Sequence, residues 1–373
     1  MESHLSSCNS LSNADCGKGW KIESYLHVRA NVLYNPLTDL SIGAHEPDYR
    51  ELRSLLDGRL SVDDLPLTLK DRFIEQGWVI ADGPDLSRRF LLKYVSLEAR
   101  SICNQACYFC PVSAAPRKDQ LMPMDLYENI VIQVAAYRDT IEGVFMFNYN
   151  EPTMDKRFVE QVSMIKKYGL PPVVNTNASG LTPAIVDKVV GMGGLRYLSI
   201  NLSTLDRTRY QRDRGKDHLD VVMRNLNYMK NRPIAQQMVI VVLGAEHHEH
   251  HRDFQAISDF FSGSNFQVQQ APIMDRAGRL PVGLKPFQLN TKLRGCEQMG
   301  SRPLQHLHIT AHGKCVLCCQ DYNETYIVGD LTKQAVAEVL AGPELARMRR
   351  WVYGVEKAPE DFICRRCVFA LNG

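Results

Sequence analysis

Short apolar segments alternate with amphipathic helical patterns over residues 93–270, and this alternation constrains the fold more than any other feature of the 373-residue chain. Helical spacing of apolar residues follows Asp125, Arg157, Thr182, Asp217 and Arg252, and we expect Asp125 and Asp217 to cap their helices. Nearly all-apolar strands that alternate with helices predict a parallel sheet covered by helices. The expected strands are residues 93–99, 144–147, 173–177, 197–202, 238–243 and 266–270. Since a full barrel needs eight such units, the sequence predicts an α/β fold with a partial, open (β/α)6 barrel of the TIM type.

Charge and composition narrow the classes of function. The 44 Lys and Arg residues against 42 Asp and Glu residues give a net charge of +2, which argues against a nucleic-acid partner, because a general polyanion binder needs a strongly basic face. The longest apolar run, residues 238–245, is far shorter than the roughly 20 residues of a membrane span. The N-terminal segment lacks the apolar core of a secretory signal. We therefore expect a cytoplasmic protein without a membrane partner.

Changes in pattern along the chain predict four parts. Residues 1–19 are polar and rich in Ser and Asn, as expected for a disordered tail. Residues 20–92 combine short strands with two helical patterns and predict a small α+β module. Residues 93–272 correspond to the barrel. Residues 273–373 begin with a Pro- and Gly-rich linker and continue with short strands and two short helices, which predicts a C-terminal domain.

Eleven cysteines are grouped along the chain. Their odd number in an apparently cytosolic protein is poor evidence for a disulfide framework. Cys103, Cys107 and Cys110 have the spacing C-x3-C-x2-C directly after the first barrel strand, and six more cysteines lie from Cys296 to Cys367. Three thiolates can hold three irons of a four-iron, four-sulfur cluster and leave one iron open, whereas zinc normally takes four protein ligands. Buried thiols or a zinc loop are the alternatives.

The first group resembles the cysteine motif of the radical S-adenosylmethionine (radical SAM) superfamily. The resemblance implies that Cys103, Cys107 and Cys110 hold a four-iron, four-sulfur cluster whose open iron chelates the amino and carboxylate groups of SAM. It implies that one electron from the cluster releases a 5′-deoxyadenosyl radical, which abstracts a hydrogen atom from an unactivated carbon. A flavodoxin- or ferredoxin-type electron donor follows from the same resemblance. Phe109 matches the hydrophobic residue of the family that packs against the adenine.

Polar segments at the ends of the predicted strands resemble other SAM-binding parts of the family. The segment from Tyr149 to Pro152 resembles a Gly-Gly-Glu-Pro turn that holds the amino group of SAM, although both glycines are replaced. Arg214 and Gly215 resemble an Arg-Gly pair common after the fourth strand. Ordinary capping of strand ends is the alternative for the Asn and Ser residues of this set. The resemblance thus implies the SAM-binding residues Phe109, Tyr149, Asn150, Glu151, Asn177, Asn201, Ser203 and Arg214.

The second cysteine group resembles the twitch module, a shortened relative of the SPASM domain. In both modules a first cysteine precedes a Gly-x4-Cys hairpin and a later CxxC pair, and Gly313 to Cys318 and Cys364 to Cys367 have these spacings. Only six residues follow Cys367 and none is cysteine, so one auxiliary four-iron, four-sulfur cluster is expected. Zinc is the alternative, because four thiolates also suit that ion. The implied ligands are Cys296, Cys318, Cys364 and Cys367.

Two cysteines of this second group, Cys315 and Cys319, are left over. Because side chains alternate along a strand, Cys318 and Cys319 are expected to point to opposite faces, and both could not easily bind one cluster. Cys318 is the preferred ligand, with Cys315 or Cys319 as possible replacements. Cys319 is also a candidate catalytic hydrogen-atom donor, although inert packing is the more ordinary role of a buried cysteine.

Two polar runs outside these groups are expected to have no special role. The histidine-rich run at residues 247–251 looks like a metal-binding tract, but clustered histidines are more often exposed to solvent. The arginine-rich run at residues 347–350 predicts a solvated helix face. His306 and His308 alternate with apolar residues, as in ordinary hairpins.

The class of reaction follows from the second cluster, because a closed cluster with four protein ligands is suited to accepting or relaying an electron. We therefore expect a net oxidation, a cross-link or an epimerisation. The module at residues 20–92 resembles one found in maturases of ribosomally made peptides, which pairs an edge strand with a leader peptide; a structural cap on the barrel is the alternative. Relatives with only a twitch module include dehydrogenases and epimerases of aminocyclitols and aminosugars. A peptide is thus the expected substrate, a small polar sugar-like molecule is the alternative, and a two-cluster electron-transfer protein is the non-enzyme alternative.

Overall fold

A computed structural model describes residues 19–83, 86–245, 248–280, 282 and 289–373. These residues form two compact units that divide between Ser87 and Arg88, and each unit is described by itself. The predicted disordered tail, with Cys8 and Cys16, lies outside the described residues apart from Gly19.

The N-terminal unit packs two helices and two small antiparallel sheets around one apolar core. Helices α1 (Tyr49–Leu56) and α2 (Leu67–Glu75) form where the helical patterns predicted them. Leu33, Leu52, Phe73 and Trp78 are at most 2% exposed in the core of this unit. The strands are β2 (His27–Arg29), β3 (Val32–Asn35) and β4 (Leu40–Gly43) in one sheet, and β1 (Trp20–Ile22) with β5 (Val79–Ala81) in the other.

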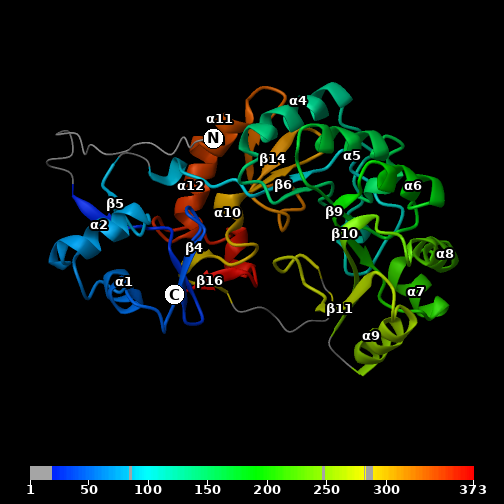
Figure 1. Cartoon of the computed structure of the whole chain (residues 1–373), viewed down its shortest axis with the longest axis horizontal. Helices are drawn as coiled ribbons and strands as arrows, with labels where there is room; N and C mark the ends of the chain where they lie inside the picture. Colours follow the sequence, from blue (N-terminus) through cyan, green and yellow to red (C-terminus); the bar gives the residue numbers. More distant parts are fainter. Residues whose placement is uncertain (1–18, 84–85, 246–247, 281, 283–288) are drawn as a thin grey trace, which may run out of the picture. The chain divides into compact units, whose positions relative to one another are not determined.

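Six parallel strands, in the order of the sequence, form the centre of the second unit. They are β6 (Tyr94–Leu97), β7 (Gly143–Phe145), β8 (Pro172–Thr176), β9 (Leu195–Asn201), β10 (Ala235–Gly244) and β11 (Phe266–Pro272). The helices between them lie in an arc along the outer side of the strands (Figure 1): α4 (Met124–Val134), α5 (Phe158–Lys167), α6 (Pro183–Gly191), α8 (Leu219–Met229) and α9 (His248–Phe260). The predicted partial (β/α)6 barrel is confirmed.

The two faces of these strands differ in burial. Val95, Val174 and Leu198 are fully buried, and because side chains alternate along a strand they pack against the helices. Asn175 and Ser199, which are opposite each other in the β8–β9 register, are only partly buried. The polar residues near the carboxyl ends of the strands therefore face the concave side, where sites form in such sheets.

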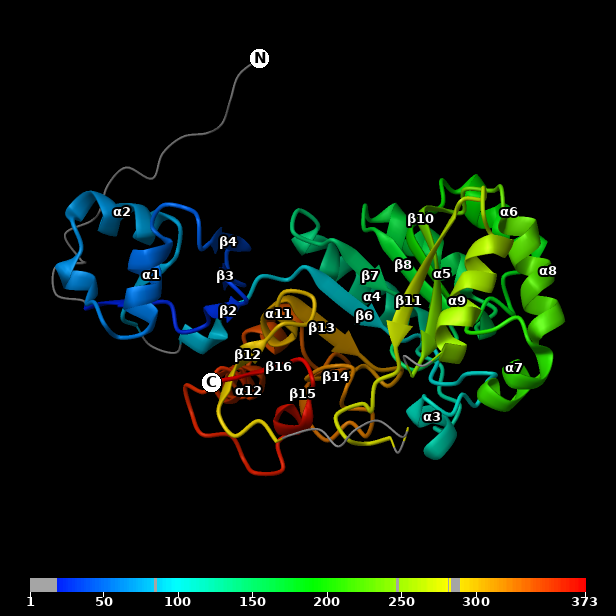
Figure 2. The same ribbon diagram turned by 90° about the horizontal axis from the view of Figure 1, so that it is seen from below.

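The C-terminal segment extends the same sheet. Strand β13 (His306–Ile309) pairs in parallel with β6, and β14 (Lys314–Val316) and β15 (Ile327–Asp330) follow in antiparallel order. Figure 2 shows β13 beside β6. The other elements of this segment are β12 (Leu293–Cys296), which pairs with β16 (Ala370–Asn372), and the helices α10 (Arg302–Gln305), α11 (Val336–Leu340) and α12 (Pro343–Val352). The barrel and the C-terminal segment consequently belong to one compact unit.

Two predicted helix caps were wrong, and one helix of eight or more residues was missed. Helix α4 begins one residue before Asp125, so this carboxylate lies in the first turn, where it still interacts favourably with the helix dipole. The cap of α8 is His218, because Asp217 instead pairs with Arg207 at 2.8 Å. The missed helix, α7 (Arg207–Arg214), has almost no apolar residues and therefore no helical periodicity to reveal it.

Two predictions of solvent exposure were also wrong. Within the histidine-rich run, His250 is 2% exposed, and its Nε2 lies 2.9 Å from the carbonyl oxygen of Val242; His247 lies outside the described residues. Within the arginine-rich run, Arg349 is fully buried and donates from Nε to the carbonyl oxygen of Pro303 at 2.8 Å.

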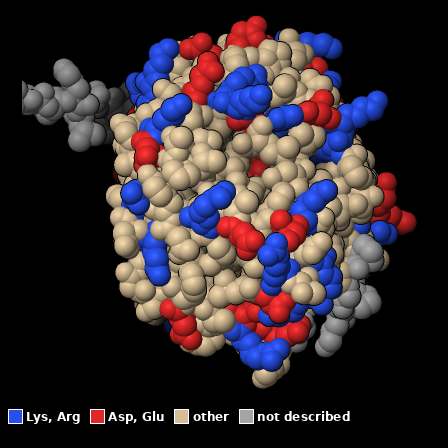
Figure 3. Space-filling view, turned by 90° about the vertical axis from the view of Figure 1, so that its right-hand side faces the viewer, with Lys and Arg blue, Asp and Glu red and all other residues tan. Residues whose placement is uncertain are grey.

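Charges of both signs are mixed on one face of the molecule. On the face shown in Figure 3, Lys and Arg side chains are interspersed with Asp and Glu, so this face lacks the basic patch that nucleic acids require. Within the ranges that the structure describes, every helix is too short or too polar to cross a bilayer.

The burial of a side chain on a strand or helix predicts how much its truncation lowers the free energy of unfolding. Leu198 on β9 is fully buried, so Leu198→Ala should lower the free energy of unfolding by about 2–5 kcal/mol through loss of contacts and a cavity. Ile132 on α4 is 46% exposed, and Ile132→Ala should change it by less than about 0.5 kcal/mol. Denaturant unfolding followed by circular dichroism measures both, and equal losses would contradict the assignment.

Candidate functional site

The three thiols of the first cysteine group lie on the loop that follows β6. Cys107 is buried, and Cys103 and Cys110 are partly buried. Burial, with the Glu151 carboxylate and the two neighbouring thiols, raises the pKa of Cys103 to about 12. Burial also raises the pKa of Cys110. The thiols of Cys103 and Cys110 are therefore protonated at neutral pH unless a metal binds and deprotonates them.

Helix α7 fixes the cysteine loop through the backbone. The Ala106 N–H donates to the carbonyl oxygen of Arg214 at 2.9 Å. Gly215, the next residue, has a φ of 65°, and a Cβ there would lie 3.0 Å from the Cβ of Ala106. A glycine suits this position both for its left-handed backbone and for the close approach, which gives the Arg214-Gly215 pair a physical reason.

Arg214 gathers several of the expected SAM-binding residues beside Cys107. Its Nη2 donates to Asn201 Oδ1 at 2.5 Å and to Ser203 Oγ at 2.9 Å, and its Nη1 lies 3.6 Å from Cys107 Sγ. The guanidinium also lies over the ring of Phe109, 4.9 Å from its centroid. Arg214 is 2% exposed. The site therefore holds a buried cation next to a thiol.

Glu151 connects the turn after β7 to β8 instead of presenting a free carboxylate. Its oxygens accept hydrogen bonds from Thr153 Oγ1 and Thr176 Oγ1, both at 2.6 Å, and from the Asn177 N–H at 2.7 Å. Burial raises the pKa of Glu151, although these hydrogen bonds oppose the rise. Its own N–H donates to the carbonyl oxygen of Ile102 at 3.0 Å. Glu151 thus positions two strand ends against the cysteine loop.

The two asparagines expected at the SAM site have different surroundings. Asn177 Nδ2 donates to Asn104 Oδ1 at 2.8 Å and lies 4.0 Å from Cys103 Sγ. Asn150 Oδ1 accepts from the Asn148 N–H at 3.1 Å. Asn177 is thus placed beside the first cysteine group, whereas the amide of Asn150 shapes its own turn.

Tyr149, which replaces a glycine of the resembled turn, fills space between the two halves of the unit. Its ring packs against Tyr322 with centroids 4.7 Å apart, and both rings belong to a cluster with Val112 that contacts Cys103 and Cys110. Burial raises the pKa of Tyr149, and the nearby thiols of both groups contribute to the rise. A side chain from the turn after β7 therefore contacts both the first cysteine group and the C-terminal segment.

A buried ion pair that the sequence analysis missed lies under Tyr149. Arg117 donates from Nη1 to Glu98 Oε2 at 3.2 Å and from Nη2 to the carbonyl oxygen of Tyr322 at 2.6 Å. Glu98 is fully buried, and it also accepts from the Tyr149 N–H at 3.2 Å. A lone carboxylate at the end of an apolar strand was the one available signal, because a buried charge needs a partner.

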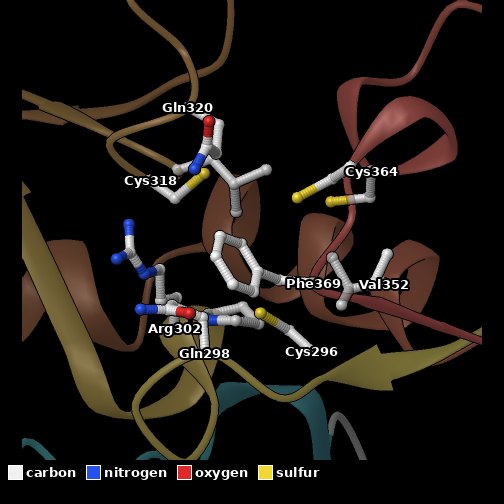
Figure 4. A pocket seen from close by; sticks show the side chains of 12 residues that line it. Cys296, Gln298, Arg302, Cys318, Gln320, Val352, Cys364 and Phe369 are labelled. Carbon is white, nitrogen blue, oxygen red and sulfur yellow. The ribbon is translucent and has the colours of Figure 1, made fainter. Parts of the chain in front are cut away.

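The four expected ligands of the second group line one cavity, Cys296, Cys318, Cys364 and Cys367. Figure 4 shows Cys296, Cys318 and Cys364 pointing toward this shared space, with Val352 and Phe369 between them. Burial raises the pKa of all four thiols, to about 12 for Cys367. Backbone N–H groups oppose the rise at three of them by favouring the thiolate, those of Gln298 and Arg302 at Cys296, of Gln320 at Cys318 and of Phe369 at Cys367.

The leftover cysteines are outside this lining. Cys315 is fully buried on β14, and the thiol of Cys319 accepts a hydrogen bond from Arg302. Strand β14 ends at Val316, so the expected alternation along a strand does not apply to Cys318 and Cys319. Cys318 and Cys319 lie in the loop and turn that follow β14, not on a strand.

Both thiol sets fit an iron–sulfur cluster in chemistry and burial. Soft thiolates in a largely apolar setting, with N–H groups directed at sulfur, are typical of such centres. Among the described residues, no three His, Cys, Asp or Glu side chains form a group that could hold a metal ion. A four-iron cluster does not require the thiols to converge on one ion, because each thiolate bonds a different iron.

Comparisons with known proteins agree with this chemistry. Residues 99–257 match the radical SAM superfamily, and residues 296–368 match SPASM, an iron–sulfur cluster-binding domain. A tungsten-containing aldehyde ferredoxin oxidoreductase cofactor-modifying protein of Pyrococcus furiosus is 27% identical over 112 residues, 30% of this chain and 31% of that protein. A probable GTP 3′,8-cyclase of Pyrococcus horikoshii is 28% identical over 141 residues, which are 37% of this chain and 44% of that protein. The chain thus spans less than half the length of these two relatives.

A third relative is matched over most of its length. The S-adenosyl-L-methionine-dependent 2-deoxy-scyllo-inosamine dehydrogenase of Niallia circulans is 19% identical over 282 residues, which cover 74% of this chain and 93% of that protein. The sequence identity is low but the match covers most of both chains, which indicates a shared fold.

Solved structures give the same fold. Streptococcus suis SuiB bound to precursor peptide SuiA has a TM-score of 0.57 at 13% identity and covers 93% of both chains. The enzyme anSMEcpe with bound AdoMet has a TM-score of 0.51 at 13% identity, over 74% of this chain and 87% of that one. The two family matches show that the chain belongs to the radical SAM superfamily and carries a C-terminal SPASM iron–sulfur cluster-binding domain.

Proposed function

We propose that this radical SAM enzyme modifies a ribosomally made peptide, by oxidation, cross-linking or epimerisation. The observation that carries the proposal is the N-terminal unit, an α+β module that a small-molecule oxidase does not evidently need. The fold likeness to SuiB extends over 93% of the chain and so includes most of this unit. A structure of SuiB contains a precursor peptide.

Cys103, Cys107 and Cys110 would hold the first cluster. With SAM bound, this centre supplies a 5′-deoxyadenosyl radical. The residues of this chain bind and orient SAM and the substrate, and they exclude water from the site. Arg214, held by Asn201 and Ser203, places a positive charge beside Cys107, and Phe109, 8% exposed, offers an apolar surface to the adenine.

Cys296, Cys318, Cys364 and Cys367 would hold one auxiliary cluster, which supplies a place for an electron to leave or pass. All four thiols come from the protein, so this centre has no position open to substrate. That arrangement supports a net oxidation. The leftover thiol of Cys319 stays a candidate hydrogen-atom donor for the epimerisation alternative.

The edge of the N-terminal sheet offers a binding mode for a leader peptide. Strand β4 pairs with β3 on one side, and in the sheet as described no strand covers its other side. Leu40 on this strand is 40% exposed. An open edge accepts an extended peptide through main-chain hydrogen bonds.

An aminocyclitol or aminosugar substrate is the second candidate. The similarity to the Niallia circulans dehydrogenase, over 93% of that protein, supports it. The chemistry expected of the two clusters is the same for both candidates, so the substrate alone separates them.

Reduced enzyme should cleave SAM to 5′-deoxyadenosine and methionine without substrate. Cys107→Ala removes one ligand of the first cluster, so cleavage should fall to the background of the assay while about half of the iron stays bound at the second site. Liquid chromatography of anaerobic reactions with dithionite measures the product. A two-cluster electron-transfer protein would yield no 5′-deoxyadenosine in either form.

The cavity lining predicts which thiol of the neighbouring pair holds iron. Cys318→Ala should lose about half of the iron, because the auxiliary cluster loses a ligand, whereas Cys319→Ala and Cys315→Ala should keep it. Iron and sulfide analysis after anaerobic reconstitution, with Mössbauer spectroscopy, provides the measurement. Iron loss in Cys319→Ala but not in Cys318→Ala would reverse the assignment.

The two substrate classes can be offered side by side. We expect a peptide encoded next to this protein's gene to change mass during turnover, and 2-deoxy-scyllo-inosamine to remain unchanged. Ser41→Pro on β4 should weaken capture of that peptide at the sheet edge, because proline disfavours pairing, without changing uncoupled SAM cleavage. Oxidation of 2-deoxy-scyllo-inosamine with no peptide product would overturn the peptide proposal.

A further inference from the structure

Arg302 is a buried cation on the wall of the second cysteine cavity. It is 9% exposed, begins helix α10 and lines the cavity together with the four expected ligands. Its Nη1 donates to the thiol of Cys319, and Figure 4 shows it on the same side of the cavity as Cys318. Its Nε has no hydrogen-bond partner among the described residues.

The charge of Arg302 has no carboxylate to balance it. No Asp or Glu of the described part of the chain forms an ion pair with it. Burial alone would lower the pKa of Arg302, yet the thiols of Cys319, Cys318 and Cys296 raise it. A buried charge is costly unless it is paired, so thiolate groups are the available source of negative charge.

Cysteine binds a metal as the thiolate. A metal deprotonates a coordinating thiol outright. Four thiolates carry more negative charge than the iron core carries positive charge, so the complete centre is a net anion. An anionic cluster therefore satisfies a cation that the protein alone leaves unpaired.

The segment around Arg302 is held by the C-terminal end of helix α12. Ser301, the residue before α10, is fully buried and accepts a hydrogen bond from the Tyr353 hydroxyl at 2.8 Å. The carbonyl oxygen of Pro303, the residue after it, accepts from Arg349 Nε at 2.8 Å. The backbone N–H of Arg302 also favours the thiolate of Cys296. The guanidinium is thus a fixed feature of the cavity wall.

We propose that Arg302 is the counter-charge of the auxiliary cluster and raises the reduction potential of that cluster. The inference rests on the proposed ligand set of the auxiliary cluster. Reduction adds negative charge, and a nearby buried cation stabilises the more negative state. Net charge and hydrogen bonds to sulfur are known determinants of cluster potentials.

The test is a redox titration of the full chain, monitored by electron paramagnetic resonance. Cys103, Cys107 and Cys110 are all replaced by Ala in this background, so the auxiliary cluster gives the whole signal. Arg302→Gln removes the charge and should lower the equilibrium constant for reduction at least tenfold, a shift of about 59 mV to more negative potential. Arg302→Lys keeps the charge and should shift it less.

Arg366→Gln is the matched control. Arg366 lies between two of the expected ligands in the sequence but is exposed. Solvent screens such a charge, so the equilibrium constant should change by less than about threefold. A shift for Arg366→Gln as large as that for Arg302→Gln would overturn the proposal, because burial of Arg302 would then not matter.

The other outcomes separate this inference from the proposed function. A midpoint potential unchanged or raised in Arg302→Gln overturns the inference while the cluster assignment stands. If Arg302→Gln loses the cluster, Arg302→Lys decides between the two roles. A cluster that Arg302→Lys retains, with a potential near that of the unsubstituted background, supports the counter-charge. Loss of the cluster in both variants assigns Arg302 a structural role and overturns the inference. If the unsubstituted background binds no iron, the auxiliary ligand set itself is wrong.

Discussion

The parallel pairing of β13 with β6 is the contact on which the rest of the site depends. Strand β6 leads into the first cysteine loop, and β13 lies between two of the segments that carry the second cysteine group. Because the strands share one sheet, the two thiol sets belong to one compact unit. Parallel pairing needs a long crossover connection, and the whole barrel, from β7 to β11, provides it here.

Each thiol set has its own buried guanidinium. Arg214 lies beside Cys107 and Arg302 beside Cys319, and neither has a carboxylate partner among the described residues. Arg214 also binds Asn201 and the hydroxyl of Ser203, whereas the Nε of Arg302 is unpartnered. Guanidinium groups keep their charge when buried. Positive charge fixed next to sulfur is therefore a common feature of both cysteine groups.

The strand pattern of the sequence predicted the barrel, and the resemblance to the twitch module implied the four thiols that line one cavity. The sequence contains much less information about residues whose roles depend on contacts with residues distant along the chain. Arg117 and Glu98 are 19 residues apart, and Arg302 meets Cys319 across 17 residues, so no local pattern signals either pair. Helix α7 was missed because its charged surface has no apolar period. Burial of His250 could not be inferred either, because its neighbours in the run are polar.

The replacement of glycine by Tyr149 shows why departures from a family motif carry information. A glycine in that turn would leave the space beside Cys110 open, whereas the tyrosine ring fills it and packs on Tyr322 from the C-terminal segment. Arg117 lies over the Tyr322 ring at 4.3 Å and pairs with Glu98, which in turn accepts from the Tyr149 N–H. The turn, the cysteine loop and the C-terminal segment are consequently joined by one buried network. Tyr149, one of the two motif positions that differ from the family, thus takes part in joining the C-terminal segment to the first cysteine loop.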